Sequence, residues 1–424
     1  MDPPPSPAPG SSPRIIPYAI PERRIDPDAA KVVRRLTRYG YQAYLVGGCV
    51  RDLLLNRTPK DFDVATSARP ADVKSLFRNC RIIGRRFRLA HVLFGSSKLI
   101  EVATFRRDPK LELDTVEWEG ESDEAVIRPR AKNRDEDLLI RQDNTFGEPH
   151  EDAARRDFTM NALFYDLDRQ EIVDYVGGMA DIQRKLLRTI GEPDVRFRED
   201  PVRILRALRF AGRLDVAIEP DVYDAMIVHR EDLLRSARPR LMEELLRLSR
   251  SGASRRSFWL AWETGVLSVL LPELSSFLDD DSKMRSRLWR RLGIMDARIA
   301  EGQVMSEAVL LSTLLLEPVE EAIEGERDPL IAVGDFLADT TERLALPRRL
   351  FDRMRAVLAV QRRLSSGRVG ALARRDFYNE AALTYSLDAE ARGVPAEDIR
   401  AVISGRDVSQ KPRKAAPAVA DPGE

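Results

Sequence analysis

Two aspartates separated by one residue, Asp61 and Asp63, are the clearest candidates for chemistry in this chain. They stand in an Asp-Phe-Asp-Val run that predicts a β-strand, and alternate residues of a strand point to the same side. Two carboxylates on one side, next to apolar Phe62 and Val64, are unfavourable unless a cation neutralises them. The pair therefore predicts a site for two Mg²⁺ ions, which suits phosphoryl transfer.

A site of this kind usually needs a third carboxylate, and the sequence offers two. Glu101 lies in the predicted strand 98–104, and Asp157 lies in an Arg-Arg-Asp-Phe-Thr-Met-Asn run over 155–161. Glu101 could instead lie on a solvated strand face, and Asp157 could cap a helix or pair with an arginine. The sequence leaves the choice between the two open.

Gly47 and Gly48 follow an apolar strand and precede a predicted helix. Glycines at such a turn let backbone N–H groups approach a phosphate closely, although an ordinary tight turn has the same appearance. Asp61 follows Gly48 by 13 positions, so a phosphate site and a metal site could belong to one centre.

A third pattern, Glu-Asp-Pro-Val-Arg over 199–203, could recognise a base. A carboxylate beside a guanidinium, here Asp200 and Arg203, complements the donor and acceptor edge of adenine or cytosine, and guanine and uracil present the reverse order. The alternative is structural, with Asp200 as helix N-cap and Pro201 in the first turn.

Four arginines gather close to the predicted strands. They are Arg81, Arg85, Arg86 and Arg88. Such a cluster suits the phosphates of a nucleotide or a primer, and a solvated loop is the alternative.

The elements that must position these residues change character along the chain. Short β-rich runs occupy about 42–175, with helical stretches between them, whereas helical periodicity dominates after about 195. The prediction is an α+β fold, with a mixed sheet and helices followed by an all-α part. Residues 1–27 and 405–424 are rich in Pro and lack apolar periodicity, so we expect disordered tails.

Composition excludes several classes of protein. No apolar run approaches the roughly 20 residues of a membrane span, and three histidines exclude a multi-histidine metal hydrolase. Two cysteines exclude a disulfide framework and favour a cytoplasmic setting. The net charge is zero, but 59 of the 69 basic residues are Arg, and ten of them lie within 343–375 beside one acidic residue. Neutrality therefore does not exclude an RNA partner.

Taken in order, the motifs resemble those of the class II nucleotidyltransferases, which comprise tRNA CCA-adding enzymes and bacterial poly(A) polymerases. They are Gly-Gly-Cys-Val-Arg-Asp, Asp-Phe-Asp, Arg-Arg-Asp-Phe-Thr-Met-Asn, Asp-Tyr-Val-Gly-Gly-Met-Ala-Asp and Glu-Asp-Pro-Val-Arg. Residues 80–94 look like a bacterial poly(A) polymerase signature, as does the Arg-rich stretch from Leu344.

The resemblance implies a polymerase-β-like head at 28–190, a base-reading, RNA-contacting helical neck at 191–255 and an RNA-binding body at 256–404. It implies metal ligation by Asp61 and Asp63, with Asp157 catalytic. The nucleotide-binding residues it implies are Gly47, Gly48, Arg51, Arg155, Arg156, Asn161, Asp200 and Arg203.

The activity implied is addition of AMP from ATP to RNA 3′ ends by a Mg²⁺-dependent monomer without membrane attachment. A CCA-adding enzyme and a catalytically silent RNA-binding protein are the alternatives. The intact carboxylates argue against the silent protein.

Overall fold

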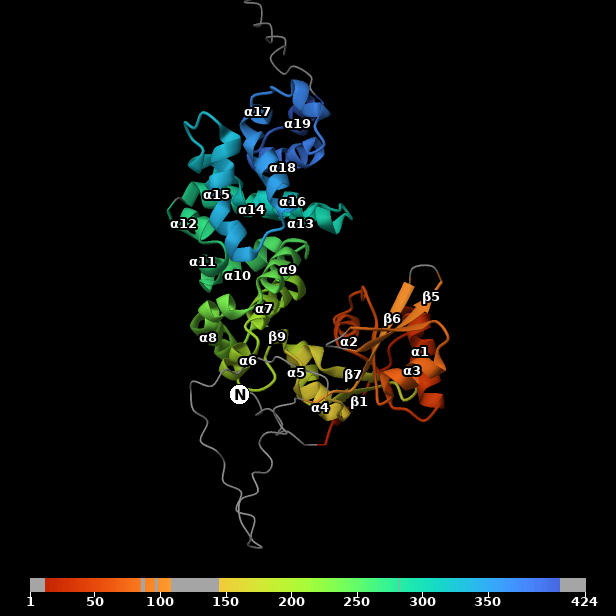
Figure 1. Cartoon of the computed structure of the whole chain (residues 1–424). Coiled ribbons are helices and arrows are strands. Elements are labelled where there is room, and N and C mark those ends of the chain that lie inside the picture. Colours follow the sequence, from red (N-terminus) through yellow and green to blue (C-terminus); the bar gives the residue numbers. More distant parts are fainter. Residues whose placement is uncertain (1–11, 85–87, 96–97, 108–144, 281, 405–424) are drawn as a thin grey trace, which may run out of the picture. The chain divides into compact units, whose positions relative to one another are not determined.

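The computed structural model describes residues 12–84, 88–95, 98–107, 145–280 and 282–404 (Figure 1). The chain divides into two compact units, Met1–Ser236 and Ala237–Glu424. The division falls inside the stretch 191–255 that the sequence predicted as a neck. Helices from the first part of that stretch pack on one another and on the short β9–β10 ladder, so they belong to the first unit.

A mixed eight-stranded sheet organises the first unit. Its strand order is β1-β8-β7-β2-β3-β6-β5-β4, and β3 and β6 are its only parallel neighbours among the described residues. The strands lie where the sequence predicted them, apart from β1. Their bounds are β1 Arg14–Pro17, β2 Ala43–Val46, β3 Asp63–Thr66, β4 Cys80–Ile83, β5 Leu89–Phe94, β6 Lys98–Thr104, β7 Leu163–Asp166 and β8 Glu171–Asp174.

Helices and a separate two-stranded ladder complete this unit. The ladder pairs β9 (Leu186–Leu187) with β10 (Ala217–Ile218). The helices are α1 Pro27–Arg38, α2 Gly48–Leu54, α3 Pro70–Leu76, α4 Pro149–Ala154, α5 Gly178–Arg184, α6 Pro193–Glu199, α7 Val202–Leu214 and α8 Pro220–His229, with 3-10 turns η1 Glu22–Arg24, η3 Thr159–Asn161 and η4 Arg230–Arg235. The α+β class predicted from the sequence is confirmed.

The two faces of the sheet differ. Leu45, Val64 and Val102 project to one face and are fully buried, where α1 and α3 pack against the strands. On the opposite face a cluster that includes Phe164 and Ala153 of α4 covers one end of the strands. The other end of this face carries the polar residues described below.

The N-terminal tail predicted as disordered over 1–27 is ordered from residue 12. Strand β1 pairs antiparallel with β8 at the sheet edge, and the Ile20 N–H donates to the Tyr165 hydroxyl over 3.3 Å. Ile20 and Ile25 are buried. The prediction was wrong here because an edge strand gains its pairing from a partner more than 150 residues away, and a Pro-rich context conceals the short apolar run.

We therefore predict that removing residues 1–17 destabilises the first unit by about 1–2 kcal/mol, or about 3–6 °C in Tm, because the backbone of β8 loses its partner. Removing only residues 1–11 is the control and leaves Tm unchanged. Calorimetry of both truncations measures the difference, and equal Tm values for the two would contradict a stabilising β1.

The second unit is helical throughout its described residues. The helices are α9 Arg238–Ser249, α10 Ser254–Glu263, α11 Val266–Leu270, α12 Pro272–Asp280, α13 Ser282–Ala300, α14 Glu307–Ala322, α15 Pro329–Leu344, α16 Arg348–Ala359, α17 Gln361–Ser365, α18 Tyr378–Ala391 and α19 Ala396–Ile403, with the 3-10 turn η5 Gly370–Arg374. Fully buried Arg291 on α13 pairs at 2.7 Å with both Glu317 of α14 and Asp388 of α18, which fixes three helices together. No described helix has the length and apolarity needed to cross a bilayer.

Candidate active site

One row of residues across the open end of the sheet brings acidic and basic side chains together. Asp63 of β3 is the register partner of Glu101 of β6, Glu101 is opposite His91 of β5, and His91 is opposite Arg81 of β4. Directly opposed residues project from the same face of a sheet. The row therefore places two carboxylates, an imidazole and a guanidinium on one surface, with the His91 Nε2 3.6 Å from Glu101 Oε1.

Asp63 carries an unfavourable charge in this setting. Burial, followed by the negative charge of Glu101, raises the pKa of Asp63 to about 6, with Asp61 adding to the effect and Arg156 opposing it. No described cation forms an ion pair with Asp63. Asp61 is exposed and precedes β3, so the prediction that both aspartates lie within the strand was wrong, although their charges still act on one another.

These carboxylates offer the hard oxygen ligands that Mg²⁺ prefers, and no lysine or arginine of the described residues forms an ion pair with Asp63 or Glu101. Among the described residues, no group of three His, Cys, Asp or Glu side chains converges closely enough to form a metal site unaided. Asp63, Glu101 and Asp61 would hold the ion together with substrate oxygens and water, which is the usual arrangement for Mg²⁺. The raised pKa of Asp63 is consistent with this assignment, because a bound cation would offset the repulsion.

A glycine turn lies beside the carboxylates. Val46, the last residue of β2, is the register partner of Asp63, so Gly47 follows at the same edge of the site. Gly47 has φ +72°, and a Cβ on it would meet the Arg156 Nη1 at 3.0 Å. The position therefore needs glycine both for its backbone conformation and for the close approach of a guanidinium. Gly48 opens α2 directly after it.

Arg156 is the cation closest to this turn. Its guanidinium contacts Asp152 Oδ2 at 2.9 Å and donates to the Asn161 carbonyl at 3.2 Å, and it lies 5.6 Å from the Phe164 ring centroid. Arg155 donates to the other oxygen of Asp152 at 3.0 Å. Asp152 thus positions both arginines, and Arg156 faces the site.

Three motif residues predicted to act on the nucleotide or the metal are instead buried in a polar network. Arg51 binds Asp52 through two nitrogens and donates to Asn161 Oδ1 at 2.6 Å; Asn161 Nδ2 donates to Asp157 Oδ1 at 3.0 Å. The second oxygen of Asp157 accepts from Arg206 Nε at 2.8 Å. In these contacts Arg51, Asn161 and Asp157 already use, within the protein, side-chain atoms that would otherwise bind a nucleotide or a metal ion.

Both oxygens of Asp157 already accept hydrogen bonds from the protein, so we infer a structural role for this residue and favour Glu101 as the third carboxylate. Burial would raise the pKa of Asp157, but Arg206, Asn161 and the Phe158 N–H hold that pKa well below its usual range. Arg51 and Asn161 belong to the same network, and we infer that they act by positioning its members. Sequence reasoning missed Arg206, because nothing in the pattern of α7 pairs it with a residue 49 positions away, and it missed His91, whose role depends on strand register.

We predict that Asp157→Asn lowers stability at pH 7 by about 2–3 kcal/mol, because it breaks a buried ion pair while Arg206 remains partly hydrated. The depressed pKa means that the wild-type contribution is present above the ordinary carboxyl range near pH 4 and is lost as the pH falls below it. The Tm difference between wild type and variant therefore narrows as the pH is lowered from about 4 to 3. A variant with wild-type Tm at pH 7 but no activity would restore the catalytic assignment.

The residues proposed to read the base lie at the junction of α6 and α7. Arg203 is buried, and its Nη1 donates to Glu199 at 3.1 Å and to the Arg196 carbonyl at 2.9 Å. The N-cap of α7 is Pro201 rather than Asp200, which is the last residue before it. Arg196 Nη2 donates to the carbonyl of Arg155 at 2.9 Å, which links this junction to the Arg155–Arg156 turn.

The arginine cluster is described in part. Arg81 is exposed at the end of the polar row, and Arg88 is exposed just before β5; Arg85 and Arg86 lie outside the described residues. Cys49 lies beneath the glycine turn with its Sγ 3.2 Å from the Val46 carbonyl, and burial raises the pKa of this thiol to about 12. It is therefore not a nucleophile.

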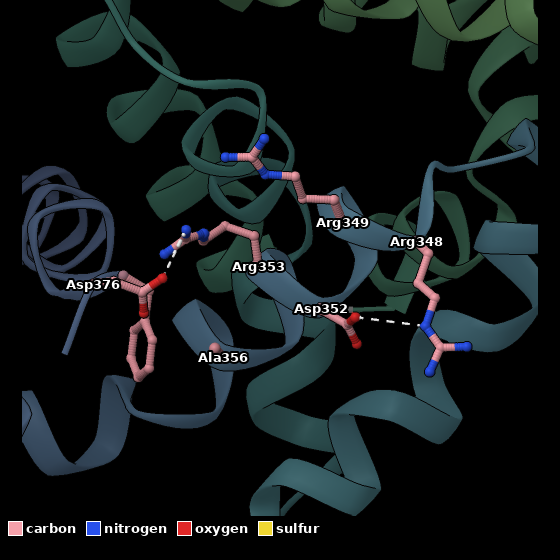
Figure 2. Close-up of a pocket in the computed structure, with 7 residues that line it drawn as sticks. Arg348, Arg349, Asp352, Arg353, Ala356 and Asp376 are labelled. Carbon is pink, nitrogen blue, oxygen red and sulfur yellow. Dashed lines mark ion pairs between the residues drawn. The ribbon is translucent and has the colours of Figure 1, made fainter.

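The Arg-rich segment of the second unit forms a separate cavity of about 590 Å³ (Figure 2). Figure 2 shows Arg348, Arg349 and Arg353 projecting from α16. Two of them face acids, since Arg353 pairs with Asp376 at 3.0 Å and Arg348 with Asp352 at 3.8 Å. Most of the charge here is neutralised, so this groove is a weaker candidate for binding a polyanion than its sequence suggests.

Comparison with known families places this geometry in context. Residues 43–188 match the family described as the poly A polymerase head domain, and residues 215–278 match a probable RNA and SrmB-binding site of polymerase A. The first match contains the polar row, the glycine turn and the buried network except for Arg206. Asp200, Arg203 and Arg206 lie between the two matches.

Comparisons with individual proteins indicate the same family as the two family matches. The chain is 40% identical to poly(A) polymerase I of Salmonella typhimurium over 360 residues, which cover 82% of this chain and 74% of that protein. It is 35% identical to a CCA-adding enzyme of Geobacillus stearothermophilus over 248 residues, 58% of this chain and 55% of that one. Among solved structures, the Bacillus stearothermophilus CCA-adding enzyme in complex with CTP aligns with TM-score 0.66 and 26% identity, covering 91% of this chain and 83% of that chain.

Proposed function

The chain belongs to the poly(A) polymerase family and is an RNA nucleotidyltransferase, and on that premise we propose that it adds AMP from ATP to RNA 3′ ends with Mg²⁺ at Asp63, Glu101 and Asp61. The observation that carries the assignment of the site is the Asp63–Glu101 pair beside the Gly47 turn and Arg156. We propose the cytoplasm as its setting, where ATP and RNA are both available.

The reaction proposed is attack of a 3′-hydroxyl oxygen on the α-phosphorus of ATP, with cleavage of the bond to the bridging oxygen and departure of pyrophosphate. Bound Mg²⁺ would supply charge stabilisation and a more acidic hydroxyl. Arg156 and the backbone at Gly47 hold the triphosphate, since a guanidinium and N–H groups match phosphate oxygens. Arg81, at the other end of the polar row, is available to the primer or nucleotide phosphates, with Arg88, Arg85 and Arg86 as further candidates.

Choice of the base falls to Asp200 and Arg203 in this proposal. Glu199 holds the Arg203 guanidinium, which limits its rotamers and so prepares it to donate to adenine N1 while Asp200 accepts from N6. The same pair would also accept cytosine. CCA addition, the activity named for some related proteins, is therefore the alternative function. The Asp200/Arg203 pair does not distinguish it from poly(A) addition, so an experiment must do so.

We predict that the protein extends an unstructured RNA primer with ATP and Mg²⁺ but makes little product with CTP, GTP or UTP alone. It shows no preference for a tRNA that lacks its CCA end. Denaturing gels with each nucleotide separately give the answer. Efficient CTP addition confined to such a tRNA would identify a CCA-adding enzyme instead.

Asp63→Asn should reduce that extension by orders of magnitude without loss of fold, because it removes a ligand charge and also relieves repulsion. The exposed Asp224→Asn on α8 is the matched control and retains activity.

We also predict that Arg203→Ala lowers the ratio of kcat/KM for ATP to that for GTP. Losing hydrogen bonds from a charged group costs about 1.5–3 kcal/mol, or roughly ten- to two-hundred-fold in discrimination. Tm also falls, because Glu199 loses an ion-pair partner. A lowered Tm is therefore expected for either role of Arg203, and the ratio of kcat/KM for ATP to that for GTP is the measurement that decides between them. Glu199→Gln keeps the shape of that contact and serves as the control for stability. An unchanged ratio with a lowered Tm would mean that Arg203 is structural only.

A further inference from the structure

The polar row of the first unit has an order across the sheet. The turn proposed to hold the triphosphate follows β2, the carboxylates proposed to bind Mg²⁺ lie at β3 and β6, and His91 and Arg81 lie beyond them on β5 and β4. Neighbouring strands are about 4.8 Å apart, so β5 lies about 14 Å from β2. A triphosphate that begins at Gly47 and ends with its α-phosphate at the carboxylates leaves His91 and Arg81 without a nucleotide phosphate to bind.

The geometry of phosphoryl transfer assigns the far end of the row to the other substrate. The attacking oxygen and the leaving oxygen lie roughly in line, on opposite sides of the phosphorus atom. In the proposed function pyrophosphate leaves toward Gly47, so the 3′-hydroxyl approaches from the side of Glu101 that carries His91. The nucleotide that bears this hydroxyl then lies over β5 and β4.

His91 and Arg81 have the groups that a phosphate needs at this place. The His91 Nε2 lies 3.6 Å from Glu101 Oε1, which exceeds hydrogen-bonding distance, and 16% of the His91 side chain is exposed. Arg81 is directly opposite His91 and is exposed, and no acid of the described residues forms an ion pair with it. An imidazole N–H and a guanidinium both donate well to phosphate oxygens.

Exposed apolar side chains lie on both sides of the row. Leu99 precedes Glu101 by two residues on β6, and Ile83 follows Arg81 by two residues on β4. Alternation places both on the face of the row, and they are 42% and 49% exposed. A strip of donors between apolar side chains matches a nucleic-acid strand, because such a strand presents phosphates together with bases and riboses.

We propose that His91 and Arg81 bind the phosphates of the last two linkages of the RNA primer and so hold its 3′ end against the carboxylates. The inference rests on the proposed function, since it concerns the RNA that the enzyme extends. Neither residue contacts the reacting atoms, so both act on primer binding rather than on the chemical step. The alternatives are that the two residues bind ATP, or that His91 only orients Glu101, and each predicts a different result.

Binding of a 5′-labelled oligo(A) to the full chain, measured by fluorescence anisotropy with Mg²⁺ and without ATP, tests the contact separately from catalysis. A second oligo(A) carries uncharged methylphosphonates in place of its last two phosphates. Wild type should bind the second RNA more weakly, by roughly two- to tenfold for each hydrogen bond lost. The double variant with His91→Ala and Arg81→Gln should bind the unmodified RNA more weakly by a similar factor. Because the same contacts are removed from either side, methylphosphonates should cost this variant little more.

Steady-state extension separates the primer from the nucleotide. Arg81→Gln and His91→Ala, each alone, should raise KM for the primer and leave KM for ATP and kcat at saturating primer unchanged. His91→Gln keeps an N–H donor near the position of Nε2, so it should recover part of the primer KM, and it decides the case if the alanine variant does not fold. A raised KM for ATP would mean that the row binds the nucleotide. A fall in kcat with wild-type primer affinity would mean that His91 orients Glu101, and either result would overturn the proposal.

Matched controls use the same substitutions elsewhere in the first unit. Arg38→Gln changes an exposed arginine at the end of α1, which packs on the other face of the sheet, and His150→Ala changes an exposed histidine of α4. Both should leave KM for the primer and the response to methylphosphonates unchanged. An oligo(A) with two methylphosphonates at its 5′ end is the control for charge in general. Equal losses from the 5′ and 3′ modifications in wild type would contradict a contact at the 3′ end.

Failure of the proposed function gives a different result from failure of this inference. In the first case the wild-type protein does not extend RNA with ATP, whatever its affinity for either oligo(A). In the second case wild type extends RNA, but its affinity does not depend on the charge of the last two linkages, or the double variant loses as much from the methylphosphonates as wild type does.

Discussion

A chain of buried hydrogen bonds from Asp52 through Arg51 and Asn161 to Asp157 is the interaction on which the first unit depends. It joins α2, which begins at the glycine turn, to η3 and, through Arg206, to α7. Charges this deeply buried are tolerated only when each one is paired, so removing any member leaves another uncompensated. The network therefore fixes the separation between the turn that would hold a triphosphate and the helix that carries the proposed base-reading pair.

The same network is the reason that we propose a structural role for Asp157, whose motif suggests catalysis in the sequence. The residues of this motif are charged, closely spaced and located near the site, which are the properties that suggest catalysis in a sequence. A carboxylate, however, acts on a metal only when its oxygens are available, and the oxygens of Asp157 accept from Arg206 and Asn161. Whether these oxygens are available depends on Arg206, 49 residues away, and on Asn161, four residues away. Only the folded structure shows that both side chains contact Asp157.

Much of the fold followed from local pattern. The alternating apolar runs located seven of the eight sheet strands, and the change to helical periodicity marked the all-α part. The strand β1, the break between α10 and α11 at Gly265, with φ +71°, and the split of α16 from α17 were not predicted. Each depends on a pairing or a backbone conformation that short-range pattern does not specify. Glu101 was a candidate from its type alone, and the parallel register of β3 with β6 made it the partner of Asp63.

The buried acids of the described residues differ from Asp63 in having partners that offset their charge. Eight of them contact at least one arginine: Asp52, Asp152, Asp157, Asp181, Glu199, Glu244, Glu317 and Asp388. The ninth, Asp174, accepts from four backbone N–H groups. Asp63 forms no ion pair with a described cation, and its raised pKa reflects the resulting strain. A half-buried carboxylate that the fold leaves without a cation, facing a second carboxylate across the sheet, destabilises the protein by itself. Its place beside the glycine turn makes sense if the missing positive charge arrives with the substrate, which is why we place the chemistry at this point of the sheet.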